Sequence, residues 1–148
     1  MRNRVEVMHG VNLDTLGRRD PEHYGMLNLR ELEGRIKGFA RELDLEAAFF
    51  QTNHEGEYVE RLHRLPDVAD AALLNPGSWT HYSWAIRDAL ELTGIPAVEV
   101  HISDISSREE WRRQSVFEDL DLVIGAVSGK GVDGYRDALE MLKTEFER

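Results

Sequence analysis

The strongest constraint on the fold is a regular alternation of strand-like and helix-like segments along all 148 residues. The strand candidates are short apolar runs at residues 4–9, 46–52, 70–75, 96–102 and 120–127. Runs of this length, separated by helical patterns, are typical of parallel strands that are buried on both faces. The alternation therefore predicts an α/β protein whose sheet is covered by helices on both sides.

The helical segments are recognised by apolar residues at spacings of three and four. They cover residues 29–43, 55–65, 82–93 and 132–146. The first segment carries the pattern most clearly, at Leu29, Leu32, Ile36, Phe39 and Leu43. Polar residues just before the later segments predict Asn53 as the cap of the second helix and Thr80 or His81 as the cap of the third.

Five strands in this arrangement favour a flavodoxin-like, doubly wound sheet with the order 2-1-3-4-5. The crossovers between its strands are expected to be right-handed. The length suits one domain over residues 1–148 with an ordinary hydrophobic core. In such sheets ligands bind beyond the carboxyl ends of the strands, at the switch between the first and third strands.

Composition excludes several classes of function. The chain has no cysteine, which removes disulfides, cysteine-bound zinc and thiol catalysis. Its net charge of −10 argues against binding to a nucleic-acid backbone. No apolar run approaches the ~20 residues of a membrane span, and no secretory h-region opens the chain. We expect a cytoplasmic protein with no nucleic-acid or membrane partner.

Polar residues gather where the predicted strands end. In the stretch VEVHIS, Glu99 and His101 are two apart, so their side chains share one face of the strand. A carboxylate beside an imidazole favours the protonated ring and orients it. The pair is therefore a candidate general acid or base.

Two further segments add candidate site residues. NPGSWTHYS places Asn75 at a strand tip and His81 close to the next helix. GRRDPEHYG, residues 17–25, has glycine at both ends and is predicted to be a lid over the crevice. Its Tyr24 is a candidate base if Arg18, Arg19 or Arg108 stabilises the phenolate, since a phenol with a pKa of about 10 is otherwise a poor base.

Other patterns are weaker. Gly129, Gly131 and Gly134 have the G-x-G-x-x-G spacing, but they follow the last strand, and a dinucleotide site needs another strand and an acidic residue beyond. No histidine pair has metal-ligand spacing, so we predict no metal and no cofactor. The exit of the first strand, GVNLDTLG, is too poor in Gly, Ser and Thr for the phosphate loop of a flavin site.

Taken together, these segments resemble the type II 3-dehydroquinate dehydratases. The family reads N-G-P-N-L-N-x-L-G-x-R-E-P-x-x-Y-G where this chain has HGVNLDTLGRRDPEHYG. Its Q-S-N-x-E-G-E, N-P-G-x-x-T-H-x-S, E-V-H-x-S-N and R-E-x-x-R appear as QTNHEGE, NPGSWTHYS, EVHISD and REEWR. Order and spacing agree over nearly the whole chain.

The resemblance implies dehydration of 3-dehydroquinate to 3-dehydroshikimate by an anti elimination through an enolate, with no cofactor. It assigns Tyr24 as the phenolate that removes the α-proton. Arg19, helped by Arg108, would hold that phenolate and close the lid. Asn12 would hold a water that stabilises the enolate oxygen.

The remaining roles also come from the resemblance. His101, oriented by Glu99, would protonate the departing hydroxyl. The backbone amides of Ile102 and Ser103 would bind the carboxylate of this small anionic substrate.

Substrate hydroxyls would be held by Asn75, His81 and Arg112. Asp88 matches a family residue that reaches the site of a neighbouring subunit. The resemblance thus implies a homo-oligomer, a dodecamer built from trimers.

The chain also departs from the family pattern. Val11 replaces the usual proline and loosens a turn, Asp14 replaces a frequent Asn, and Asp20 shortens the lid Glu. Asp104 replaces Asn and adds negative charge near the carboxylate-binding amides, and residues 114–120 differ from the usual tail. Two alternatives therefore stay open: a paralogue that acts on a related cyclic hydroxy-keto acid, and a non-catalytic ligand-binding protein.

Overall fold

The computed structural model describes residues 1–148 and contains a five-stranded sheet with the order β2-β1-β3-β4-β5. Its strands are β1 (Arg4–His9), β2 (Glu46–Gln51), β3 (Ala71–Asn75), β4 (Ala97–His101) and β5 (Val123–Ser128). All neighbouring strands run parallel. The predicted fold class and strand order are confirmed.

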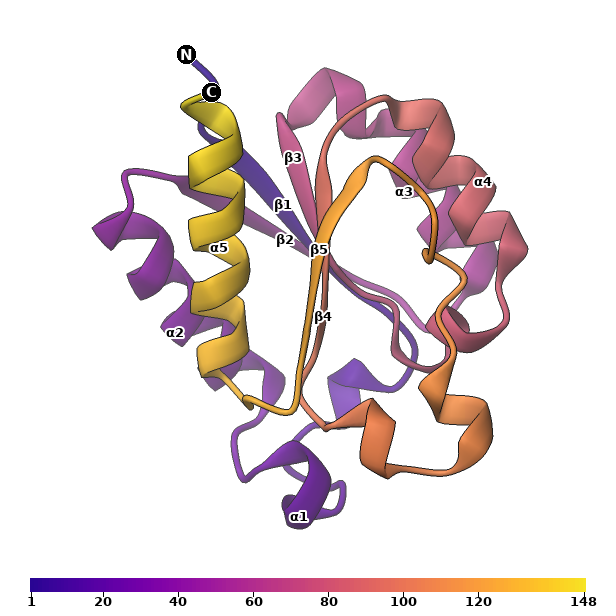
Figure 1. Cartoon of the computed structure of the whole chain (residues 1–148). Coiled ribbons are helices and arrows are strands. Elements are labelled where there is room, and N and C mark those ends of the chain that lie inside the picture. Colours follow the sequence, from indigo (N-terminus) through magenta and orange to yellow (C-terminus); the bar gives the residue numbers. More distant parts are fainter.

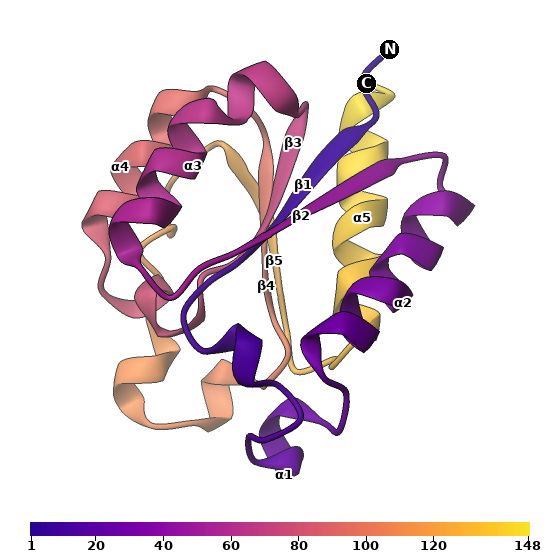
Figure 2. The ribbon, with the colours of Figure 1, turned by 180° about the vertical axis from the view of Figure 1, so that it is seen from behind.

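Helices cover both faces of the sheet (Figures 1 and 2). One face carries α2 (Leu29–Glu42) and α5 (Asp133–Phe146), and the other carries α3 (Glu55–Val68) and α4 (Trp84–Thr93). Side chains alternate between the two cores, since Val7 of β1 packs with α2 and α5 while Met8 packs with α3 and α4. None of the helices combines the length and the apolar character needed to cross a membrane.

The start and end of α3 differ from the prediction. His54, not Asn53, precedes the helix, and it makes no side-chain cap. The N–H of His54 instead donates to Oγ1 of Thr52 at 3.0 Å. The helix continues to Val68, past the predicted residue 65, with Pro66 exposed in its last turn.

The cap of α4 also differs from the prediction. Thr80 and His81 belong to a short 3-10 turn over Gly77–His81, and α4 begins after Ser83. The Oγ of Ser83 accepts a hydrogen bond from the N–H of Ile86 at 3.1 Å, which satisfies a free amide of the first turn.

The segment between β4 and β5 contains no α-helix. Two 3-10 turns, Ile105–Ser107 and Glu110–Arg113, lie there instead. The β5 strand starts at Val123, three residues after the predicted start, because residues 120–122 form a turn. These short turns place Arg108 and Arg112 next to the end of β4.

Candidate active site

A cavity of about 120 Å³ opens at the carboxyl edge of the sheet. Nine of the predicted site residues line it: Asn12, Arg19, Tyr24, Asn75, His81, His101, Ile102, Ser103 and Arg112. They come from the ends of β1, β3 and β4, from the lid segment that contains the short helix α1 (Pro21–Tyr24), and from the 3-10 turns at Gly77–His81 and Glu110–Arg113. Of the other three, Glu99 and Arg108 contact lining residues, and Asp88 lies elsewhere.

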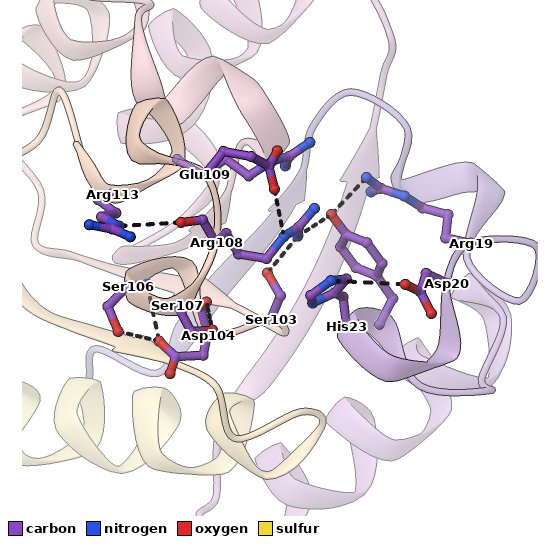
Figure 3. A network of polar contacts seen from close by, with 12 residues as sticks. Arg19, Asp20, His23, Ser103, Asp104, Ser106, Ser107, Arg108, Glu109 and Arg113 are labelled. Atoms are coloured by element: carbon purple, nitrogen blue, oxygen red, sulfur yellow. Dashed lines mark hydrogen bonds and ion pairs between the residues drawn. The ribbon is translucent and has the colours of Figure 1, made fainter.

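The phenol of Tyr24 is held by two arginines. Arg19 Nη2 and Arg108 Nη1 each donate a hydrogen bond to its Oη at 2.8 Å (Figure 3). The guanidinium carbon of Arg19 also lies 3.7 Å from the centre of the phenol ring. Two cationic donors are thus placed to stabilise negative charge on this oxygen.

The lid is shaped by its own sequence. The Oδ1 of Asp20 accepts from the N–H of Glu22 at 3.0 Å, and Pro21 occupies the first helical position. The shorter side chain at position 20 thus serves as the helix cap. Arg18, in contrast, is exposed and makes no hydrogen bond to the phenol, so it does not share the role of Arg19. Burial lowers the pKa of Arg19.

Glu99 and His101 form a buried ion pair at the end of β4. Nε2 of His101 lies 2.6 Å from Oε2 of Glu99. Thr80 Oγ1 donates to the same carboxylate oxygen at 2.5 Å, and Ser115 Oγ donates to the other at 2.8 Å. Burial raises the pKa of Glu99, but the bonds from His101, Thr80 and Ser115 outweigh it, so the pKa lies below its ordinary value. The carboxylate is therefore ionised at neutral pH.

His81 faces the same cavity as His101. Its Nδ1 lies 2.6 Å from the backbone oxygen of Gln114, which assigns the proton to Nδ1. Burial lowers the pKa of His81, and neighbouring His101 lowers it further, while the bond to Gln114 opposes the shift. A neutral ring with Nδ1–H leaves Nε2 as a hydrogen-bond acceptor.

Asn75 is oriented by its neighbours. Its Oδ1 accepts from the N–H of Gly77 at 3.1 Å, and its Nδ2 donates to the phenol oxygen of Tyr135 at 3.2 Å. Burial raises the pKa of Tyr135 to about 12, so this phenol stays neutral. The amide of Asn75 is thus fixed in one orientation toward the cavity.

The turn that carries Asn12 is braced from β2. The backbone of Asn12 is left-handed, with φ of 69°, and its N–H donates to Oδ1 of Asn53 at 2.8 Å. Asn53 also receives a bond from Gln51 and donates to Asp14. Sequence reasoning missed this role of Asn53, although the polar residues QTN at the carboxyl end of β2 were a signal for it. The brace holds the turn in which Val11 replaces proline.

Two backbone amides point to an anion site. The N–H groups of Ile102 and Ser103 donate to no protein atom, although both residues are buried beside the cavity. Paired free amides in a buried loop favour a negatively charged ligand group. Asp104, which follows them, is exposed and accepts from Ser106 N–H at 3.1 Å and Ser106 Oγ at 2.6 Å (Figure 3). Asp104 does not line this cavity, so its side chain does not point inward toward the two amides.

Arginines and one distant carboxylate complete the predicted set. Arg112 is oriented by Glu109, whose Oε2 accepts from its Nε at 2.8 Å. Arg108 Nη1 also donates to Ser103 Oγ at 3.3 Å. Asp88 does not reach the cavity, because it lies exposed on the outer face of α4 near Trp84.

The family model for dehydroquinase class II matches residues 3–143. The chain belongs to this family. A 3-dehydroquinate dehydratase of Thermotoga petrophila is 49% identical over 144 residues, which cover 97% of each chain. One from Carboxydothermus hydrogenoformans is 47% identical over 145 residues, covering 98% of this chain and 93% of its own.

Solved structures of the family share the fold. A type II dehydroquinase from Propionibacterium acnes superposes with a TM-score of 0.88 at 38% identity, covering 97% of this chain and 98% of its own. A 3-dehydroquinate dehydratase-like protein from Bifidobacterium longum is more distant, with a TM-score of 0.70 at 26% identity over 99% of both chains.

Proposed function

We propose that this cavity dehydrates 3-dehydroquinate to 3-dehydroshikimate, in the shikimate pathway, by an anti elimination through an enolate. One observation carries the proposal: a phenol gripped by two guanidiniums lines the same small cavity as a carboxylate-bound imidazole. The chain thus has a base and an acid in one site. The relatives named 3-dehydroquinate dehydratase support the choice of substrate.

Tyr24 is the base. A proton next to a ketone is weakly acidic, so its removal needs both a strong base and stabilisation of the enolate oxygen. The bonds from Arg19 and Arg108 hold Tyr24 ready as a phenolate. A water on the side-chain amide of Asn12 stabilises the enolate oxygen that forms.

His101 is the acid. Glu99 binds Nε2 of the ring, which favours the imidazolium and leaves Nδ1 without a protein partner. The ring gives its proton to the departing hydroxyl, so that water rather than hydroxide leaves. Tyr24 enters the cavity from the lid and His101 from the end of β4, which suits removal of the two groups from opposite faces of the substrate ring.

The other lining residues bind the substrate. The amides of Ile102 and Ser103 take its carboxylate, which matches their lack of protein acceptors. Asn75, neutral His81 and Arg112 hold its hydroxyls. We expect Arg112→Ala to raise KM while it changes kcat little.

A direct test follows the product in the ultraviolet, where its conjugated enone absorbs. The wild-type protein should turn over 3-dehydroquinate without added metal or cofactor. Tyr24→Phe should lose roughly 10²- to 10⁴-fold in kcat, the usual contribution of a general base. Tyr82→Phe is the matched control, because Tyr82 is 56% exposed and does not line the cavity. An unchanged kcat in Tyr24→Phe would overturn the assignment of the base.

We also propose assembly as a dodecamer built from trimers, in which Asp88 approaches the cavity of a neighbouring subunit. Its support is the outer face of α4, where Asp88 lies among the exposed apolar side chains Trp84 and Leu92. Sedimentation of the purified protein and of Asp88→Ala, with kinetics of both, tests this assembly. The cytoplasmic location stays a prediction, which cell fractionation would test.

A further inference from the structure

The glycine-rich segment after β5 lies against the end of β4. Gly131 N–H donates to the carbonyl of Ile102 at 3.3 Å, and Gly129 N–H donates to the carbonyl of Ser103 at 3.0 Å. Both acceptor residues line the cavity that we propose binds the substrate. The two glycines do not line this cavity, but they line an adjoining pocket together with Tyr24, Ile102 and Ser103.

The geometry of a peptide unit links these bonds to the anion site. The carbonyl of Ile102 and the N–H of Ser103 belong to one planar unit and point in opposite directions. A bond that fixes the carbonyl toward Gly131 therefore fixes the amide toward the cavity. The bond from Gly129 fixes the next unit, which joins the carbonyl of Ser103 to the N–H of Asp104, so the two bonds hold the peptide units on both sides of Ser103.

Glycine is required at position 129. Its φ is +78°, a region that other residues rarely adopt. A Cβ built there would lie 2.9 Å from Cβ and 3.3 Å from Cα of Asp104, so the segment that follows Ser103 would have to shift. Gly131 also has positive φ, at +57°, but it faces open space.

We propose that Gly129 and Gly131 form a backbone clamp on both sides of Ser103 that aims the Ser103 amide at the carboxylate of the substrate. Gly129 is then a positioning residue for recognition of the acid group. The glycine spacing that resembles a dinucleotide fingerprint serves this purpose instead. The inference rests on the proposed function, because it assumes that the two amides receive the substrate carboxylate.

The test compares Gly129→Ala with Gly94→Ala. Gly94 has a similar φ of +66° but no atom within 4 Å of its missing Cβ, and it lies at the opposite edge of the sheet. Both variants carry left-handed strain, and only the first disturbs the clamp. Gly129→Ala should raise KM for 3-dehydroquinate about tenfold, the cost of one misaligned bond to an anion, with kcat changed less than about threefold. Gly94→Ala should leave KM unchanged.

A second substrate separates a loss of recognition of the acid group from a general loss of order in the cavity. The methyl ester of 3-dehydroquinate lacks the negative charge that the amides bind. For Gly129→Ala, kcat/KM should fall about tenfold for the acid and by less than about twofold for the ester. An equal fall for both substrates would overturn the clamp.

A double variant guards against failure of Gly129→Ala to fold. Asp104→Gly removes the Cβ that the new alanine would meet. The double variant Gly129→Ala with Asp104→Gly should therefore have a KM close to that of Asp104→Gly alone. A wild-type protein with no turnover would overturn the proposed function and the clamp together. A wild type with turnover, and an unchanged KM in Gly129→Ala and in the double variant, would overturn only the clamp.

Discussion

Replacing Ser115 by alanine would remove one of three hydrogen bonds that hold the buried carboxylate of Glu99. A hydrogen bond to a charged group contributes about 1.5–3 kcal/mol. Ser115 is partly buried, so water reaches the gap incompletely. We therefore expect Ser115→Ala to lower the free energy of unfolding by about 2 kcal/mol at pH 7.

The loss should depend on pH in a defined direction. The folded pKa of Glu99 lies below 4.5, so its charged form stabilises the protein above pH 4.5, and this stabilisation disappears as the pH falls through the folded pKa. Loss of a donor raises that folded pKa, because fewer bonds favour the carboxylate. The difference in the free energy of unfolding between wild type and variant should therefore narrow as the pH falls through the folded pKa values of Glu99 in the two proteins.

Urea unfolding followed by tryptophan fluorescence measures this difference, at one fixed protein concentration. Ser107→Ala is the control, since its Oγ donates only to the exposed backbone carbonyl of Asp104. It should cost less than about 0.5 kcal/mol at any pH, as surface substitutions do. Equal losses in the two variants, or a loss in Ser115→Ala that stays constant throughout the acid range in which the protein remains folded, would refute the reasoning.

Three other outcomes are expected. Arg108→Met leaves the phenol with one guanidinium, so kcat should fall about 100-fold, while Arg18→Met should keep the wild-type rate. The carboxylate of Glu6 is only 2% exposed and accepts a hydrogen bond from Arg61 Nη2 at 2.6 Å. Arg61→Ala leaves this buried charge without its partner, so urea unfolding should show that the free energy of unfolding falls by about 2–3 kcal/mol. The bond from its arginine partner lowers the pKa of Asp70 to about 2, so Asp70→Asn should cost about 1 kcal/mol at pH 7 after screening by solvent. That cost should vanish between pH 4 and pH 2, and a constant difference in acid-unfolding curves would contradict it.

The sheet could be predicted because its signals are local. The apolar runs of β1, β3 and β4 are almost entirely buried, and the helices keep their periodic faces against them. The carboxyl ends of parallel strands must meet at one edge, so the polar exits could be assigned to one site before any geometry was known.

The side-chain positions that could not be predicted depend on contacts that the folded chain makes. Asn53 has the right chemistry for a helix cap, but its side chain is occupied by Asn12, which is 41 positions away in sequence. Asp104 could have pointed into the cavity, and a local bond to Ser106 turns its carboxylate away. Competition between such partners is decided by the folded chain, and no spacing rule reports it.

All of the proposed chemistry lies at the carboxyl edge of the sheet. The opposite edge carries the turns at Asp44 and Gly94 and both ends of the chain (Figure 1). A dye, an affinity handle or a surface tether attached at those turns would not block the entry of substrate into the cavity. The molecule can therefore be immobilised in a single orientation, with the cavity open to the solution.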